Sequence, residues 1–244
     1  MSTAPWANSR FLIPALNEEE SLPKVLDSLF GFGILPRQIL ILDNGSKDLT
    51  PQIAIDAGVV LVQEPKRGYG AACLAGIYYL QERKISPEFI VFMDADGSDD
   101  LNNLKDLFSA FSKDPNTNFV IGSRTLGNAE PGSLSFLQIF GNWLSCFLIR
   151  IFYGVKFTDL GPFRVLRWQS LLDLDLQDPT WGWNLEMQIK AIRNKFKIQE
   201  IPVHYGKRKG GKSKISGNLI GSFKAGVKIL YIFFKLTFFS NRSR

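Results

Sequence analysis

The chain has 244 residues, 45% of them hydrophobic, which is enough for one α/β domain with or without a small appendage. Its two cysteines and single histidine exclude a disulfide framework, a histidine-rich metal site and a histidine triad, and a reduced compartment is expected. The formal net charge is +6, but ten of the 29 basic residues and none of the 23 acidic residues lie from Ile201 onward. This local basic character predicts an anionic partner. The first ten residues contain no apolar signal region, so secretion is not expected.

The first half of the chain alternates short apolar runs with helical patterns. The expected strands are residues 11–14, 39–43, 59–63, 89–94 and 119–123, and large apolar residues recur at helical spacing in 22–30 and 101–111. Apolar strands that alternate with helices predict an α/β fold whose mainly parallel sheet is covered by helices on both faces. Ligands bind beyond the carboxyl ends of such strands. The polar residues that fall there are Asn17, Asp43, Arg67 and Asp94.

The second half is less regular. Residues 136–149 are uncharged but too short to span a membrane comfortably, and residues 198–205 predict a last strand. In the apolar tail, Lys224, Lys228 and Lys235 fall on one helical face. This pattern favours an amphipathic helix lying in the headgroup region, with an ordinary core-packing helix as the alternative. The predicted division is a domain of residues 1–215 followed by a basic amphipathic helix and tail of residues 216–244.

Residues 91–100, VFMDADGSDD, place four carboxylates directly after an apolar run. An EF-hand is excluded, because the glycine at its sixth position and the glutamate at its twelfth are missing. Asp99 and Asp100 precede a predicted helix and are expected to meet its N-terminus and water. That account leaves Asp94 and Asp96, which can hold Mg²⁺ or Mn²⁺ against a diphosphate.

Two further stretches are ambiguous by themselves. In KRGYGAACLAG, Gly68 and Gly70 can bring backbone close to a ligand, with Lys66 or Arg67 near a phosphate; a turn before a packed helix explains them equally well. In WGWNLEMQIK, helical spacing groups Trp183, Glu186 and Lys190, as in a sugar site or an ordinary surface helix. His204 is expected to be structural.

Read in order, these stretches resemble the family 2 glycosyltransferases. The motifs are PALNEEESL, ILDNGSKDLT, KRGYGAACLAG, VFMDADGSDD, VIGSR, DLGPFR and EIPVHYGKRKGGKSK, and they cover about residues 10–220. The likeness is strongest to the dolichyl- or polyprenyl-phosphate sugar synthase branch. It implies a GT-A fold, a nucleotide-sugar donor and a divalent metal, Mg²⁺ or Mn²⁺.

The resemblance also implies roles for individual positions. The implied donor-binding residues are Pro14, Leu16, Asn17, Glu18, Asp43 and Asp94, and the glycine and phosphate argument for KRGYGAACLAG adds Lys66 and Gly70 to them. The implied catalytic residues are Asp96, Arg124 and Asp159, where Asp159 and Arg164 lie in a segment resembling D-x-x-G-F-R. Glu186 is added to the catalytic candidates as a base for a hydroxyl acceptor. The implied acceptor-phosphate residues are Arg208, Ser213 and Lys214, which match R-x-x-G-x-S-K.

Two positions depart from the family pattern. The motif around Asp43 is usually DDGS, and Asn44 stands at its second aspartate. The branch often has Gln two positions after the second Asp of the D-x-D motif, and this chain has Ser98. The implied protein ligands of the metal are therefore Asp96 and Ser98.

The sequence thus predicts transfer of one sugar from a GDP-mannose or UDP-glucose type of donor to a polyprenyl or dolichyl phosphate. The enzyme is expected to be cytoplasmic and peripheral to the membrane surface. Alternatives are transfer to a hydroxyl, with Asp159 or Glu186 as general base, and a catalytically silent membrane-binding homologue. No nucleic-acid partner is expected, because the aromatic residues of the tail lie at helical spacing instead of on strands.

Overall fold

The computed structural model describes residues 4–210, 227 and 229–239. The strands are β1 (Ser9–Ala15), β2 (Ile39–Asp43), β3 (Val60–Gln63), β4 (Phe89–Phe92), β5 (Thr117–Ala129), β6 (Arg164–Arg167) and β7 (Lys197–Tyr205). The helices are α1 (Leu22–Gly31), α2 (Thr50–Asp56), α3 (Tyr69–Glu82), α4 (Leu104–Lys113), α5 (Phe136–Tyr153), α6 (Trp168–Asp173) and α7 (Trp183–Arg193). Short 3₁₀ turns are η1 (Pro36–Gln38) and η2 (Leu101–Asn103), and a π-helical turn, η3 (Lys235–Phe239), ends the described chain.

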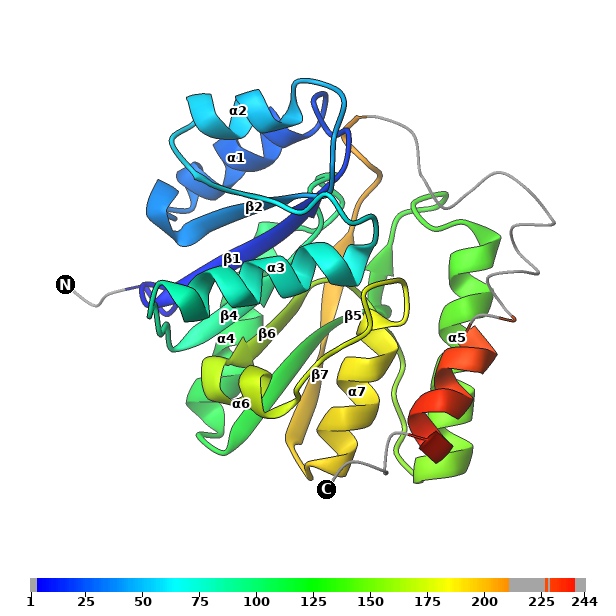
Figure 1. The fold of residues 1–244 in the computed structure, drawn as a ribbon. Helices are drawn as coiled ribbons and strands as arrows, with labels where there is room; N and C mark the ends of the chain where they lie inside the picture. Colours follow the sequence, from blue (N-terminus) through cyan, green and yellow to red (C-terminus); the bar gives the residue numbers. More distant parts are fainter. Residues whose placement is uncertain (1–3, 211–226, 228, 240–244) are drawn as a thin grey trace.

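The strands form one sheet in the order β3-β2-β1-β4-β6-β5-β7. Among the described strands only β6 runs antiparallel to its neighbours, so the predicted mainly parallel sheet is confirmed. All the predicted strands are present, although β4 ends at Phe92 instead of residue 94 and β5 continues to Ala129. The sheet lies at the centre of the molecule with helices on both faces (Figure 1).

Alternation along the central strands divides the core into two layers. Phe11, Ile13 and Ile41 face the layer that α1, α2 and α4 cover. Leu12 and Leu42 face the layer that α3, α6 and α7 cover. Because successive side chains of a strand point to opposite faces, a strand covered on both sides must be apolar throughout. This explains the uninterrupted runs in the sequence.

Helix α5 stands beside the sheet and packs against the apolar helix Ile229–Phe238, which we call the C-terminal helix (Figure 1). Ile232, Phe233 and Leu236 of the C-terminal helix are buried in the core. Tyr231, Phe234 and Phe238 are exposed. The described part of the tail therefore has features of both predicted alternatives: one face packs on the core, as in a core helix, and the other exposes aromatic side chains, as in an interfacial helix. Lys224, Lys228 and the predicted boundary at residue 215 lie outside the described residues.

Candidate active site

The loops after β1 and β2 are tied together at the carboxyl edge of the sheet. The Asn17 amide N donates to Ser46 Oγ at 2.8 Å, and Asn17 Oδ1 accepts from the Lys47 amide N at 2.8 Å. Asn17 has a φ of 51°, a conformation that asparagine tolerates better than most residues. Pro14 and Leu16 flank the last residue of β1, and Pro14 pairs with Leu42 across the sheet.

Asp43 closes the turn after β2. Its carboxylate is buried and accepts from the Ser46 amide N at 3.2 and 3.3 Å. The next loop, residues 64–68, runs beside this turn, because Asp43 O accepts from the Glu64 amide N at 2.8 Å. Lys66 in that loop is exposed. The structure therefore brings Asn17, Asp43 and Lys66, all expected to bind the donor, to one edge of the sheet.

The acidic turn after β4 is held by its own carboxylates. The Asp94 amide N donates to Asp99 Oδ2 at 2.9 Å, and the Ser98 amide N donates to Asp96 Oδ1 at 2.9 Å. Asp100 accepts from the Asn102 amide N at the start of η2, as expected of a helix cap. The expectation for Asp99 was wrong, because its side chain is buried and shapes the turn instead of meeting water.

Charge accumulates in this turn. Withdrawal from water and the neighbouring Asp96 raise the pKa of Asp94 to about 7. Burial and Asp94 raise the pKa of Asp99 well above its ordinary value. Carboxylates resist ionisation where like charges adjoin them and solvent is excluded. The turn is therefore a place where an added cation is electrostatically favourable.

A basic segment after β7 docks on the acidic turn. The Gly206 amide N donates to Ser98 O at 2.8 Å, and the Lys209 amide N donates to Asp96 O at 2.9 Å. Gly97 has a φ of 75°, and a Cβ there would lie 2.8 Å from Cδ of Lys209. The turn thus needs glycine both for its backbone conformation and for this close approach.

Arg208 joins two acidic residues from distant parts of the chain. Its Nη1 lies 2.9 Å from Asp96 Oδ2, and its Nη2 lies 2.8 and 3.0 Å from the Glu18 carboxylate oxygens. Glu18, expected to contact the nucleoside, is buried against this guanidinium. Ser213 and Lys214, the other acceptor-phosphate residues, lie outside the described residues.

Arg124 and Asp159 form a buried pair. Asp159 accepts from the backbone N, Nε and Nη2 of Arg124 at 2.7, 2.8 and 2.7 Å. The guanidinium lies over the Tyr205 ring, and the bonds to Asp159 raise the pKa of Arg124 despite its burial. Glu200 of β7 accepts from the amide N atoms of Thr158 and Asp159. Sequence reasoning missed Glu200, since a glutamate within a strand carries no signal of this contact.

The burial of Trp183 and Glu186 in α7 contradicts the interpretation that they form a sugar-stacking surface. Trp183 is buried in the core, with its ring centroid 6.1 Å from that of Phe92. Glu186 is also buried, accepts from the amide N atoms of Gln177 and Asp178 and pairs with Lys190 at 2.9 Å. Its carboxylate fixes the loop 177–180.

That loop explains the two glycines of KRGYG. A Cβ at Gly68 would lie 2.0 Å from Pro179 O, and one at Gly70 would lie 2.0 Å from Asp178 O. Both glycines are therefore required by packing, independently of any ligand. A donor contact at Gly70 stays a prediction.

Buried Arg164 of β6 lies beneath the site. Its Nε donates to Gly161 O at 2.6 Å, and burial lowers its pKa to about 10. Arg164 therefore supports the segment that carries Asp159.

The residues of the acidic turn fit a divalent cation. Asp96 Oδ2 already faces a cationic group, and the buried Ser98 Oγ has no hydrogen-bond partner among the described residues. In the described part of the chain no three His, Cys, Asp or Glu side chains group as a metal cage. Mg²⁺ and Mn²⁺ accept such a site, since few protein ligands are needed when phosphates and water supply the others.

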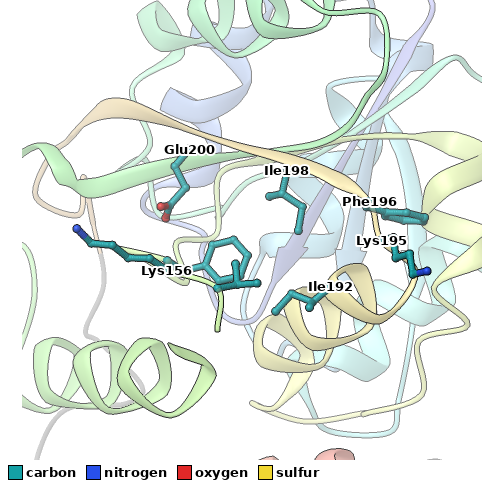
Figure 2. A pocket seen from close by; sticks show the side chains of 8 residues that line it. Lys156, Ile192, Lys195, Phe196, Ile198 and Glu200 are labelled. Carbon is teal, nitrogen blue, oxygen red and sulfur yellow. The ribbon is translucent and has the colours of Figure 1, made fainter. Parts of the chain in front are cut away.

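A separate cavity of about 510 Å³ opens between α7, the segment before Thr158 and β7 (Figure 2). Its lining is apolar except for Lys156, Lys195 and Glu200. It contains none of the residues expected to bind the donor. This cavity is distinct from the cluster at the carboxyl edge.

Comparisons with known proteins agree with this geometry. The family model described as Glycosyl transferase family 2 matches residues 11–173. An uncharacterized glycosyltransferase of Mycobacterium tuberculosis is 35% identical over 217 residues, covering 88% of this chain and 92% of its own. An undecaprenyl-phosphate mannosyltransferase of Micrococcus luteus is 31% identical over 220 residues, covering 86% and 88%.

Among solved structures, glucosyl-3-phosphoglycerate synthase from Mycobacterium tuberculosis, in complex with Mn²⁺, uridine diphosphate and phosphoglyceric acid, matches with a TM-score of 0.71. The identity is 18%, and the match covers 96% of this chain and 80% of that one. A mainly parallel sheet with this acidic turn beyond β4 is the arrangement of the GT-A glycosyltransferases, so the molecule is a glycosyltransferase of that fold. The chain belongs to glycosyl transferase family 2, whose model covers more than half of its length.

The raised pKa of Asp94 predicts a pH-dependent stability for the protein in EDTA. Native Asp94 keeps its proton up to about pH 7, whereas the unfolded chain releases it near pH 4, so stability falls as the pH rises between these values. Asp94→Asn removes that loss. We expect the variant to exceed the parent by about 2 kcal/mol in denaturant unfolding at pH 8, and by less at pH 5. Asp27→Asn, on the exposed part of α1, is the control. A gain that is equal at both pH values contradicts the assignment.

Proposed function

We propose that the protein transfers one sugar from a nucleotide-sugar donor to a polyprenyl phosphate at a membrane surface, with Mg²⁺ or Mn²⁺ as cofactor. The observation that carries this proposal is the docking of Arg208 on Asp96, beside Glu18. This contact supports a site in which the Arg208 guanidinium lies beside the predicted metal ligand Asp96, where the donor diphosphate and the acceptor phosphate would meet.

The reaction exchanges one bond at the anomeric carbon. An acceptor phosphate oxygen attacks that carbon, the bond to the donor diphosphate breaks, and the nucleoside diphosphate leaves. Asp96 and Ser98 would hold the metal, which when bound neutralises charge on the leaving diphosphate. Arg124, fixed by Asp159, and Arg208 supply positive charge from the protein itself.

The hydrogen bonding of Asp159 and Glu186 favours a phosphate acceptor over a hydroxyl acceptor. A hydroxyl acceptor needs a general base. Asp159 is occupied by three donors from Arg124, and Glu186 by two backbone amides and Lys190. An ionised phosphate needs no base, and the name of the Micrococcus luteus relative specifies undecaprenyl phosphate. Both observations favour the lipid phosphate over the hydroxyl alternative.

A membrane location is supported by the outer face of α5. Phe136, Phe140, Trp143 and Phe147 follow one another at helical spacing, with successive ring centroids 6.5, 5.9 and 5.3 Å apart. Among the described residues α5 is long and apolar enough to cross a bilayer, and only 22% of it is buried. Its 18 residues rise about 27 Å, slightly less than a hydrocarbon core of about 30 Å. We favour a helix that lies in the interface, together with the exposed aromatic face of the C-terminal helix.

The transfer reaction itself is the first test. Purified protein is incubated with radiolabelled GDP-mannose or UDP-glucose, undecaprenyl phosphate and Mn²⁺, and the lipid-linked product is extracted. We expect one donor to yield product, and EDTA or Asp96→Asn to lower the rate at least about 100-fold with little change in melting temperature, because the main protein ligand of the metal is lost. Asp27→Asn is the matched control on an exposed surface. Product formed on a dephosphorylated polyprenol would overturn the phosphate acceptor.

Arg208→Ala tests the role of the basic segment. We expect a higher acceptor KM or a kcat at least about tenfold lower, because a charge-assisted contact to phosphate is lost. Donor affinity, measured by calorimetry with Mn²⁺ and without acceptor, should stay within about threefold of that of the parent. Arg208→Lys keeps the charge without the two-pronged geometry and is expected to recover part of the rate. If donor affinity and turnover fall in parallel, Arg208 belongs to the donor site.

Two similarly exposed isoleucines, one on the proposed membrane face of α5 and one away from it on α2, allow a matched test. Ile139 on α5 is 53% exposed and Ile55 on α2 is 56% exposed. We expect Ile139→Ser to weaken sedimentation with anionic vesicles by about 1 kcal/mol, roughly fivefold, because apolar area no longer enters the interface. Ile55→Ser should bind like the parent. Equal effects of the two variants, or no vesicle binding by the parent, would exclude α5 as the membrane face.

A further inference from the structure

Asn44 binds three backbone groups of a single loop. Its Nδ2 donates to Glu64 O at 3.1 Å and to Lys66 O at 2.8 Å, and its Oδ1 accepts from the Gly68 amide N at 2.7 Å. The residue is only 6% exposed. The path of residues 64–68 is therefore set by one buried amide.

The chemistry of the three contacts requires an amide. An ionised aspartate has no donor, so it would face the two carbonyl oxygens of Glu64 and Lys66 with a negative charge. A buried acceptor that loses its donor costs about 1–3 kcal/mol, and more when a charge is involved. Asn44 stands where the family pattern usually has aspartate, and here its neutrality is what the loop needs.

The loop held in this way carries Arg67. A Cβ at Gly45 would lie 3.8 Å from Nε of Arg67, so the arginine lies against the turn that follows Asp43. Arg67 is exposed and makes no hydrogen bond or ion pair with another described residue. An exposed guanidinium on a held loop, beside a predicted nucleotide-binding turn, is suited to an anionic ligand.

We propose that Asn44 is a positioning residue that holds the loop 64–68 so that Arg67 contacts the bound nucleotide. The inference rests on the proposed function and adds to it the group that orients the donor on the β2 and β3 side. Asn44 does not touch the donor in this account. It acts through the three backbone groups and through Arg67.

The first measurement needs no ligand. Amide hydrogen exchange of the peptide containing residues 64–70 is compared in the parent and in Asn44→Ala. We expect exchange at least about tenfold faster in the variant, because the Gly68 amide loses its acceptor. The surface change Asn116→Ala, in the turn before β5, is the matched control for Asn44→Ala and should leave exchange unchanged. Unchanged exchange in Asn44→Ala would overturn the proposal.

The second measurement is a double-mutant cycle on the binding of UDP and GDP in the presence of Mn²⁺ by calorimetry. We expect Asn44→Ala and Arg67→Ala each to weaken the preferred nucleotide about tenfold, and the double variant to be little weaker than Arg67→Ala, because the two residues act as one unit. Asn44→Asp should be weaker than Asn44→Ala, and Asn116→Asp unchanged. Additive effects, or normal affinity in Arg67→Ala, would overturn the role.

Folding does not obscure either outcome. Arg67 is exposed, so Arg67→Ala tests the nucleotide contact even if Asn44→Ala is unstable. If the parent binds neither UDP nor GDP, the proposed donor and the contact of Arg67 with it are both refuted. Hydrogen exchange then still decides whether Asn44 holds the loop.

Discussion

Negative charge concentrated beyond β4 is the constraint on which the rest of the site depends. Asp96 and Asp99 are buried in one turn with Asp94, and burial together with the neighbouring carboxylates raises the pKa values of Asp94 and Asp99. Arg208, which is distant in the sequence, partly neutralises this negative charge by pairing with Asp96 and Glu18. A divalent cation would neutralise more of this charge. The excess of carboxylates therefore both attracts Arg208 and favours binding of the metal cofactor.

The arginines and carboxylates of the site work as pairs. Asp159 is engaged by Arg124, and Glu200 fixes the backbone that carries Asp159. The hydrogen-bonded Arg124–Asp159 pair holds positive charge in place before a substrate arrives. Carboxylates bound in this way are poor general bases. The arrangement is therefore suited to an acceptor that is already an anion.

Different parts of the second half of the chain contribute to two separate surfaces. β7 leads to the segment that docks on the acidic turn, whereas α5 and the C-terminal helix lie together beside the sheet (Figure 1). Both helices carry exposed aromatic side chains. This separation suits the lipid acceptor that we propose, because its charged head and apolar tail need opposite environments. Phosphate would meet the arginines while the polyprenyl chain stays with the apolar helices.

The sequence by itself determined the sheet, because strands buried on both faces must be apolar, and it located Asn17, Asp43 and Asp94 at the strand ends. Tertiary structure decided which groups meet: Arg208 with Glu18, 190 positions apart, and Asn44 with the loop 64–68. It also decided burial, placing Trp183 and Glu186 inside where helical spacing suggested a sugar-facing surface. Local periodicity fixes which face of an element is apolar, but pairing between distant loops depends on how the elements pack, which no single stretch encodes.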